Sequence, residues 1–343
     1  MKKFIALFLA MALLCSCAVK NEPQEITEEP VSTKKEPVTV FTIAVQNGMS
    51  QAAMMGLDCF VEKVNAISNG KMAIKKAFCD DVLQKLDEGC ELAFATNEEF
   101  ARSNGDFLIY SSPFYFNNYN HLTLTLNSQQ FNKAIENTNK SLLKAMPIGA
   151  FYDGNYYILS SREEMYDTTD QYEGRVFNIY DGQLLLELVL DSLGASVKER
   201  DEEYMLSNFG KNRNIAAMEC KISLLGDITK REKVESFHIC KSFHRAQINW
   251  IMLSEAAKSS LDEYQLAVLS EAIAYAIAKN DELVLENEEF AFNKAVEMGG
   301  IITAPNYEEF SRAAASAVSR SEKYGSLWNW QLYYEVKNLA LKE

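Results

Sequence analysis

Glycine, proline and histidine are scarce in this chain of 343 residues, which has 15 glycines, six prolines and three histidines. So little glycine excludes collagen-like and glycine-rich disordered proteins. Basic residues are outnumbered as well, because 34 lysines and arginines stand against 48 acidic residues and the formal charge is −14. Binding to phosphate groups needs clustered lysine and arginine, so this balance argues against a nucleic-acid partner. Composition therefore predicts an acidic globular protein, with a length that corresponds to about two domains.

The common catalytic and nucleotide-binding motifs are also missing. No G-x-G-x-x-G, P-loop, H-E-x-x-H or G-x-S-x-G pattern occurs, and no C-x-x-C pair suggests a zinc site. His238 and His244 are six positions apart, a poor spacing for two metal ligands on one helix or strand. Acidic pairs such as Glu288-Glu289 are interpreted as solvated faces. We expect no metal, no cofactor and no catalysis, although two carboxylates far apart in the chain could still form a glycosidase-like pair.

The N-terminus has the features of a secretory signal. Lys2 and Lys3 precede the apolar run 4–14, and the sequence LCSC follows and ends at Cys17. Eleven apolar residues are too few to cross a hydrocarbon core about 30 Å thick. The LCSC sequence resembles the lipobox of bacterial lipoproteins, which implies a signal peptide over 1–16 and a lipidated Cys17. A plain secretory peptide is the alternative.

The segment that follows, residues 17–37, is polar, charged and poor in aromatic residues, and it holds three of the six prolines. Such a composition cannot bury enough apolar surface to fold, so we expect a disordered tether between the lipid and the folded protein. This predicts an extracytoplasmic protein anchored to a bacterial membrane. Five cysteines remain after residue 17, an odd number that leaves at least one free thiol, and buried free thiols are expected at Cys59, Cys79, Cys90, Cys220 and Cys240.

Hydrophobic periodicity indicates two α/β units and not one large sheet. A buried strand is predicted over 38–45, an amphipathic helix over 54–67 and a second strand over 71–77. This strand–helix–strand order favours a parallel sheet. A similar pattern returns with a strand over 175–180 and a helix over 184–193.

A long helix is predicted near the C-terminus. Ser260 and Glu263 have the spacing of a capping box, and periodic apolar residues follow. A continuous helix over 261–298 would be about 57 Å long at 1.5 Å per residue, which is long enough to lie across two domains. A break near Asn280 is the alternative. A short strand is expected at 301–303.

Several stretches, taken in order along the chain, carry a resemblance to one family. They are GLDCFVEKVNAISNGKMAIKK, LDEGCELAFA around Gly89, Ser112-Pro113-Phe114, Tyr172-Glu173-Gly174 before a strand, Leu193-Gly194-Ala195, Met218-Glu219, and the C-terminal run through GGIITAPNYEEF. By their order and spacing the chain resembles the DctP-like extracytoplasmic solute-binding proteins of tripartite ATP-independent periplasmic (TRAP) transporters.

The resemblance implies an α/β fold of the two-domain periplasmic-binding-protein type, with a ligand cleft between the domains and a long bridging helix. It places domain I at 38–152 plus about 243–280 and domain II at about 153–242 plus 281–343. It also implies that the protein captures a small organic ligand and delivers it to TRAP membrane subunits, without making or breaking a bond. A ligand sensor or partner scaffold that has lost transport is the first alternative, and an enzyme on the same scaffold is the second.

The sequence departs from the family at the positions that bind anionic ligands. The arginine that closes the family's "LkGlkiR" strand corresponds to Asn178, a second arginine of some members corresponds to Tyr156, and the asparagine after "qE" is Cys220. Arg175 would face the opposite side of its strand from Asn178. Arg213 and Arg245 are other candidate donors, with surface exposure as the default.

The residues expected around the cleft are largely aromatic and neutral. The predicted ligand-binding residues are Phe114, Tyr152, Tyr156, Asn178, Tyr180, Glu219 and His244, with Trp250 as a further candidate. We expect a ligand that is neutral or amphipathic, or an acid held by unusual donors, and not a simple carboxylate. The alternative interpretation is that these aromatic side chains belong to the ordinary core.

Overall fold

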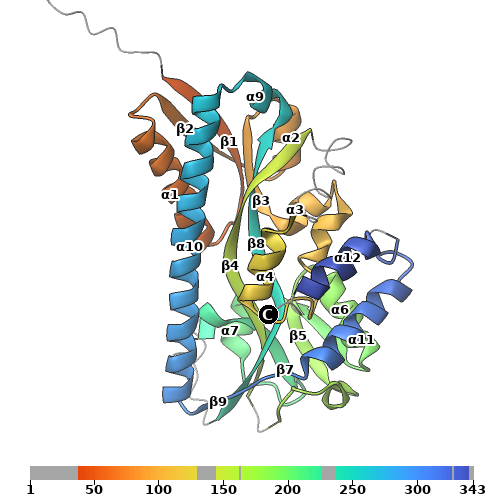
Figure 1. Ribbon diagram of the computed structural model, residues 1–343. Coiled ribbons are helices and arrows are strands. Elements are labelled where there is room, and N and C mark those ends of the chain that lie inside the picture. Colours follow the sequence, from red (N-terminus) through yellow and green to blue (C-terminus); the bar gives the residue numbers. More distant parts are fainter. Residues whose placement is uncertain (1–37, 130–143, 162–163, 226–235, 327, 340–343) are drawn as a thin grey trace, which may run out of the picture. The chain divides into compact units, whose positions relative to one another are not determined.

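A mixed β-sheet of nine strands lies at the centre of the computed structural model (Figure 1). The structure describes residues 38–129, 144–161, 164–225, 236–326 and 328–339. The predicted signal peptide, the lipidated Cys17 and the tether lie outside the described residues.

The helices and strands follow one another in an alternating α/β order. The first half of the chain contains β1 (Thr39–Gln46), α1 (Gln51–Ile67), β2 (Met72–Cys79), α2 (Val82–Asp87), β3 (Leu92–Thr96), α3 (Asn97–Ala101), α4 (Tyr119–Leu126) and β4 (Ala145–Ser160). The second half contains β5 (Val176–Tyr180), α6 (Leu184–Ser192), β6 (Ser196–Arg200), α7 (Glu202–Asn208), β7 (Ala217–Lys221), β8 (Phe237–Ser254), α9 (Glu255–Ser260), α10 (Glu263–Glu297), β9 (Gly300–Thr303), α11 (Tyr307–Arg320) and α12 (Trp330–Lys337).

The sheet consists of two parallel sets of strands joined by two long antiparallel ones. Its order is β2-β1-β3-β8-β4-β7-β5-β6, with β9 paired to β8. β1 runs parallel to β2 and β3, and β5 runs parallel to β6 and β7. β4 and β8, which have 16 and 18 residues, pair with each other and connect the two sets. Two parallel α/β units are present, as periodicity predicted, but the expectation that they do not form one large sheet is wrong, because the crossing strands β4 and β8 join them.

The long C-terminal helix is also confirmed, although it begins differently from the prediction. α10 is continuous over 35 residues, or about 52 Å, and does not break at Asn280. Its capping box is formed by Asp262 and Gln265, because Ser260 is the last residue of α9. Asn280 is buried and donates a hydrogen bond from Nδ2 to the carbonyl oxygen of Tyr152 at 2.6 Å, which ties the middle of α10 to β4.

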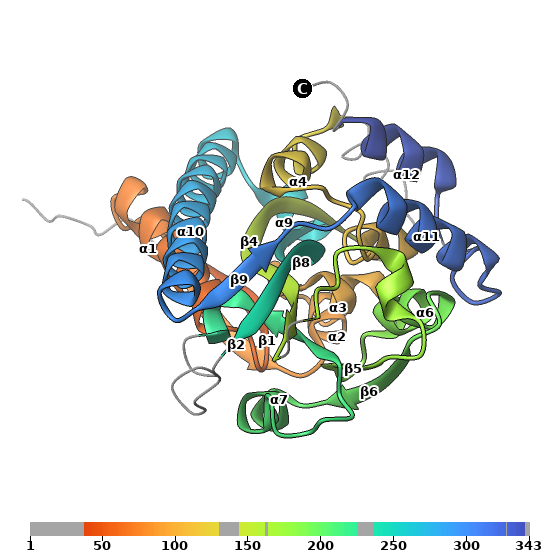
Figure 2. The same ribbon diagram turned by 90° about the horizontal axis from the view of Figure 1, so that it is seen from below.

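The core forms where helices cover the sheet. α1 and α10 lie side by side (Figures 1 and 2), and their apolar faces pack with residues of β1, β3 and β8 in one cluster. In the other half, apolar residues of α6 and α11 pack on β5. The proposed domain division would fall inside β4, β8 and α10, three continuous elements, and it stays a prediction.

Three further observations concern the described residues. Within them, no helix combines the length and apolar character needed to span a bilayer. No group of three or more potential metal ligands gathers in the part of the chain that the structure describes. All five cysteines predicted to be free carry free thiols; Cys220 and Cys240 are buried, whereas Cys59, Cys79 and Cys90 are only half-buried.

Candidate functional site

The carboxyl ends of the two parallel strand sets converge on one cavity. β3 pairs antiparallel with β8, β8 pairs antiparallel with β4, and β4 pairs antiparallel with β7. β7 therefore runs in the opposite direction to β1 and β3, and the carboxyl ends of the two sets point toward each other. Thr96 at the end of β3 pairs with Asn249, and Lys221 at the end of β7 pairs with Tyr156. In open α/β sheets, ligands bind beyond the carboxyl ends of the strands. A cavity of about 860 Å³ lies there.

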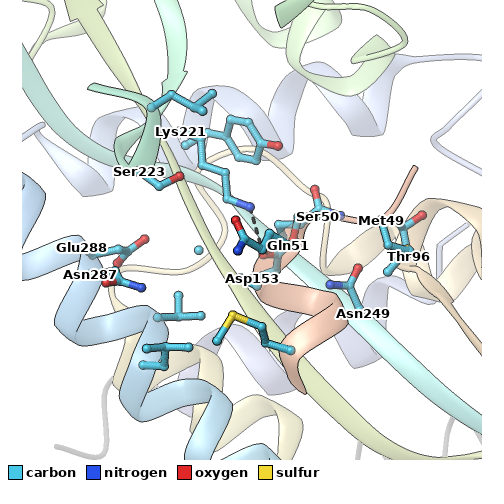
Figure 3. A pocket seen from close by; sticks show the side chains of 18 of the residues that line it. Met49, Ser50, Gln51, Thr96, Asp153, Lys221, Ser223, Asn249, Asn287 and Glu288 are labelled. Carbon is cyan, nitrogen blue, oxygen red and sulfur yellow. Dashed lines mark hydrogen bonds and ion pairs between the residues drawn. The ribbon is translucent and has the colours of Figure 1, made fainter. Parts of the chain in front are cut away.

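Seven helices and strands and the loops beside them build the cavity wall, which Figure 3 shows from close by. The lining residues are Gly48, Met49, Ser50, Gln51, Ala52, Met55, Thr96, Asp153, Gly154, Tyr156, Glu202, Lys221, Ser223, Leu224, Gln247, Asn249, Leu283, Val284, Asn287 and Glu288. They come from the start of α1, the middle of β4 and β8, the ends of β3 and β7, α7 and the second half of α10.

The start of α1 is fixed to β4 and β7 by a short polar chain. Ser50 caps α1, since its side chain accepts a hydrogen bond from the N–H of Ala53 at 3.0 Å. The Ser50 hydroxyl in turn lies 2.7 and 2.8 Å from the two carboxylate oxygens of Asp153. Asp153 Oδ1 also forms an ion pair with Lys221 Nζ at 3.0 Å (Figure 3). One carboxylate therefore links the two halves of the sheet across the cavity wall.

Gly154 makes this arrangement possible. The pairing of β4 with β8 shifts its register between Tyr152 and Asn155, so Asp153 and Gly154 lie in an irregular stretch of the strand. Gly154 has φ +94°, a conformation that favours glycine. A Cβ there would approach Lys221 Cε at 3.2 Å and Glu288 Oε1 at 3.3 Å, so glycine also leaves room for both side chains.

Glu288 lines the cavity from α10, and the interpretation of Glu288-Glu289 as a solvated face is wrong for this residue. Glu288 is 9% exposed and shares a buried face of the helix with Val284 and Phe292, four residues before and after it. Its Oε1 accepts the N–H of Asn155 at 2.8 Å, and the hydroxyl of Tyr152 lies 3.1 Å from both carboxylate oxygens. Burial raises the pKa of Glu288. The helical spacing of 284, 288 and 292 was the signal that could have identified it.

Asn249 contributes an amide without a partner. It lies in the middle of β8, lines the cavity and has no exposed surface. Neither its Oδ1 nor its Nδ2 has a hydrogen-bond partner within the described residues. Buried polar groups are nearly always hydrogen-bonded, so this amide has an unused donor and an unused acceptor at the cavity.

Behind the cavity, a buried ionic cluster joins β7 and β8. Arg245 donates from Nε and Nη2 to Oε1 of Glu219 at 3.0 and 2.8 Å, and His244 Nε2 lies 3.3 Å from the same oxygen. Glu219 Oε2 accepts the backbone N–H of Tyr180 at 3.1 Å. The guanidinium also lies over the ring of Tyr156, 3.6 Å from its centroid. Arg245 is 3% exposed, contrary to the default of a surface arginine.

The electrostatics of this cluster favour an ionised carboxylate. Burial alone would raise the pKa of Glu219, but the charge of Arg245 and the hydrogen bonds from His244 and Tyr180 outweigh it and lower the pKa to about 2. Burial lowers the pKa of His244, more than its contact with Glu219 raises it. Burial raises the pKa of the Tyr156 hydroxyl to about 12, although the charge of Arg245 opposes this. The cluster therefore holds one carboxylate and one guanidinium in permanent charge balance.

The structure brings several of the seven predicted ligand-binding residues together around Glu219. Tyr156 lines the cavity, and Tyr180 packs edge-on against it with ring centroids 5.5 Å apart. Glu219 and His244 lie in the buried cluster just described. The contact of these residues with a ligand stays a prediction.

The other three predicted residues are buried and do not line the cavity. Tyr152 is buried and hydrogen-bonded to Glu288, one step behind the cavity wall. Phe114 stacks on Phe310 with ring centroids 4.6 Å apart, and Asn178 is buried on β5 with an unpartnered Oδ1. Trp250, the further candidate, donates from Nε1 to Asn97 Oδ1 at 3.0 Å and packs in the core.

Sequence reasoning missed most of the polar lining. Asp153, Lys221, Asn249 and Glu288 were not predicted, because their partners are far apart in the chain and only the sheet brings them together. The other two candidate arginines, Arg175 and Arg213, are not among the lining residues. Arg175 pairs with Glu164 at 3.4 Å, and Arg213 is exposed.

No family model and no curated protein sequence matches the chain. Solved structures match its fold. A TRAP periplasmic solute-binding protein from Escherichia fergusonii, in an apo open structure, has a TM-score of 0.73 at 18% identity over 88% of this chain and 99% of that chain.

Two other matching structures contain ligands. A TRAP periplasmic solute-binding protein from Ralstonia eutropha with bound (S)-2-acetolactate has a TM-score of 0.67 at 13% identity, over 89% of this chain and 99% of that chain. One from Desulfovibrio desulfuricans with bound sn-glycerol-3-phosphate has a TM-score of 0.67 at 16% identity, over 89% and 98%. The predicted mixed α/β fold of the two-domain periplasmic-binding-protein type is thereby confirmed.

Proposed function

We propose that this protein is the solute-binding subunit of a TRAP-type transporter. It captures a small organic ligand in the cavity at the middle of the sheet and delivers it to TRAP membrane subunits, without chemical conversion. The cavity at the carboxyl ends of β1, β3 and β7 is the observation that carries the proposal. Its volume of about 860 Å³ falls in the range of small-molecule sites, which runs from about 300 to 1,000 Å³. The fold shared with TRAP solute-binding proteins supports the same conclusion.

The proposal includes the cellular location. A signal peptide over 1–16 would direct export, and lipidation of Cys17 would anchor the protein to a bacterial membrane outside the cytoplasm. The polar residues 17–37 would then serve as the tether. The two domains proposed for 38–152 with 243–280 and for 153–242 with 281–343 would close around the ligand by a hinge motion.

A simple carboxylate is not the ligand in this proposal. Asn178 stands where the TRAP family places its carboxylate-binding arginine, and Arg245, the buried arginine near the cavity, already binds Glu219. Acetolactate and glycerol-3-phosphate, the ligands of two similar structures, both carry negative charge. This protein would offer its ligand no carboxylate-binding arginine of this kind, so we expect a ligand whose binding does not depend on such an arginine.

Native mass spectrometry tests the function directly. The protein is purified without denaturation, and any small molecule released on unfolding is identified. A stoichiometric organic ligand supports the solute-binding function. Tight co-purification of a C4-dicarboxylate would contradict the proposed ligand chemistry, while leaving solute binding itself intact.

A ligand sensor or partner scaffold that has lost transport is the second candidate, and the replacement of the family arginine by Asn178 favours it. Genes for TRAP membrane subunits beside the gene for this protein would contradict this candidate. Ligand-dependent uptake that requires those subunits would contradict it as well.

A further inference from the structure

The cavity wall carries more negative than positive charge. Asp153, Glu202 and Glu288 line it, and Lys221 is the single basic residue among the lining residues described. Lys221 is already paired with Asp153 at 3.0 Å. Two carboxylates in excess therefore face the cavity, one from the rim at Glu202 and one from the buried wall at Glu288.

Glu288 lacks a directly paired cation. Its hydrogen bonds come from the N–H of Asn155 and the hydroxyl of Tyr152, which are neutral donors. Among the described residues, no basic side chain lies within 4.0 Å of its carboxylate, and the charges of Lys221 and Lys241 act on it only from beyond that distance. A buried carboxylate is stable when a cation pairs with it, so a positively charged ligand group would supply what the protein does not.

The charges around the cavity are unfavourable for an anionic ligand. Arg245 does not line the cavity, and its Nε and Nη2 donate to Glu219 while Nη1 lies 3.4 Å from Gln247 Oε1. An anion would have to displace Asp153 from Lys221, and its charge would be repelled by the carboxylates of the wall. The negatively charged wall would thus repel anions such as the ligands of the similar structures.

Asn249 is independent evidence that a polar ligand fills this cavity. Its amide is completely buried, lines the cavity and has neither donor nor acceptor satisfied within the described part of the chain. Leaving such a group unpaired is unfavourable, so a hydroxyl, amide or amine of a ligand would be held there. Met55, Leu283 and Val284 add apolar surface for a carbon chain.

We propose that the cavity binds a small organic cation, with an ammonium group of the ligand at Glu288 and a second polar group at Asn249. The inference rests on the proposed solute-binding function and specifies its ligand class. It assigns Glu288 as the charge-selective residue of the site.

A matched ligand series tests the charge preference. Isothermal titration calorimetry is performed on the ligand-depleted protein with 1,5-diaminopentane, 1,5-pentanediol and glutarate, which share one carbon chain and differ in charge. We expect the diamine to bind more tightly than the diol, and glutarate to bind least. Glu288→Gln should weaken diamine binding about tenfold or more, because a hydrogen-bonded charge pair contributes about 1.5–3 kcal/mol.

Glu289→Gln is the matched control. It removes the same charge from the neighbouring residue of α10, which is exposed and does not line the cavity, so diamine affinity should be unchanged. Circular dichroism melting of both variants verifies that each is folded. Tighter binding of glutarate, equal binding of the diol, or an unchanged affinity in folded Glu288→Gln would overturn the inference.

The released ligand separates this inference from the proposed function. A co-purified molecule that carries an ammonium group supports both, even where the diamine is too short or too long. A co-purified molecule without one overturns the cation class and leaves solute binding intact. The absence of any co-purified molecule and of any binding in the series contradicts both.

Discussion

The guanidinium of Arg245 lies over the ring of Tyr156, 3.6 Å from its centroid. Tyr156 lines the cavity and Arg245 does not, so the aromatic ring covers a charge that would otherwise be close to the ligand. A desolvated cation–π contact contributes about 2 kcal/mol, and the carboxylate of Glu219 neutralises the same guanidinium. The charge of Arg245 is therefore used inside the protein.

We expect Glu219→Gln to destabilise the protein strongly. The substitution keeps the shape of the side chain but leaves the buried guanidinium of Arg245 without its counter-charge. Removing one partner of a buried ion pair costs about 3–5 kcal/mol. Urea denaturation followed by circular dichroism measures the loss. Glu322→Gln, at an exposed position, should change the free energy of unfolding by less than about 0.5 kcal/mol. A loss as small as that of the control would mean that the ion pair contributes little.

Stability should fall in acid in a way that depends on Glu219. Its pKa is about 2 in the folded protein and 4.5 is the ordinary value, so it stabilises the fold above pH 4.5 and loses this contribution as the pH falls toward 2. This lowering of the pKa of Glu219 corresponds to about 3 kcal/mol of stability. Urea unfolding at several pH values should show that the wild type loses about this much more than Glu219→Gln. Parallel curves for the two proteins would contradict the prediction.

Ser50→Ala should affect both stability and ligand binding. It removes the N-cap of α1, which costs about 1 kcal/mol, and it frees Asp153 from one of its partners at the cavity. Ser254→Ala removes the equivalent cap of α9, which is not among the lining elements. We expect a similar loss of thermal stability in both variants and weaker binding of the co-purified ligand only in Ser50→Ala. Equal affinities would show that the hydrogen bond from Ser50 to Asp153 does not matter for binding.

Gly154→Ala should disturb the cavity more than a comparable change elsewhere. At φ +94° an alanine is strained by about 1–2 kcal/mol, and its Cβ would press on Lys221 and Glu288. Gly89 has φ +107°, and a Cβ added there would meet no atom within 4 Å, so Gly89→Ala bears the strain without the crowding. Thermal melts should show a larger loss for Gly154→Ala, and calorimetry should show weaker ligand binding only in that variant. Equal effects would mean that Lys221 and Glu288 move aside at no cost.

The sequence predicted elements whose signals are local. The strand–helix–strand pattern of β1, α1 and β2 and the presence of a long helix at α10 follow from the periodicity of apolar residues, which depends on neighbours within a few turns, whereas the absence of a break near Asn280 was left open. The cap of α10 was placed two residues too early, because Ser260 and Asp262 are both good capping residues and only the end of α9 separates them. Glu288 shared a helical stripe with Val284 and Phe292, and that stripe indicated burial, although its acidic neighbour suggested a solvated face.

What the sequence by itself determined was the class of fold, since the periodicity of its apolar residues is written in residue order and spacing. The correspondence of Asn178 to an arginine of TRAP solute-binding proteins stays a prediction. Only the tertiary structure decided which charges meet. Asp153 pairs with Lys221, Glu219 pairs with Arg245, and Glu288 lies without a paired cation in the described part of the chain, although these residues are separated by up to 135 positions. Electrostatic interactions depend on the distance between charges and on their burial. The pairing of β4 with β8 determines both, and no local sequence pattern contains this information.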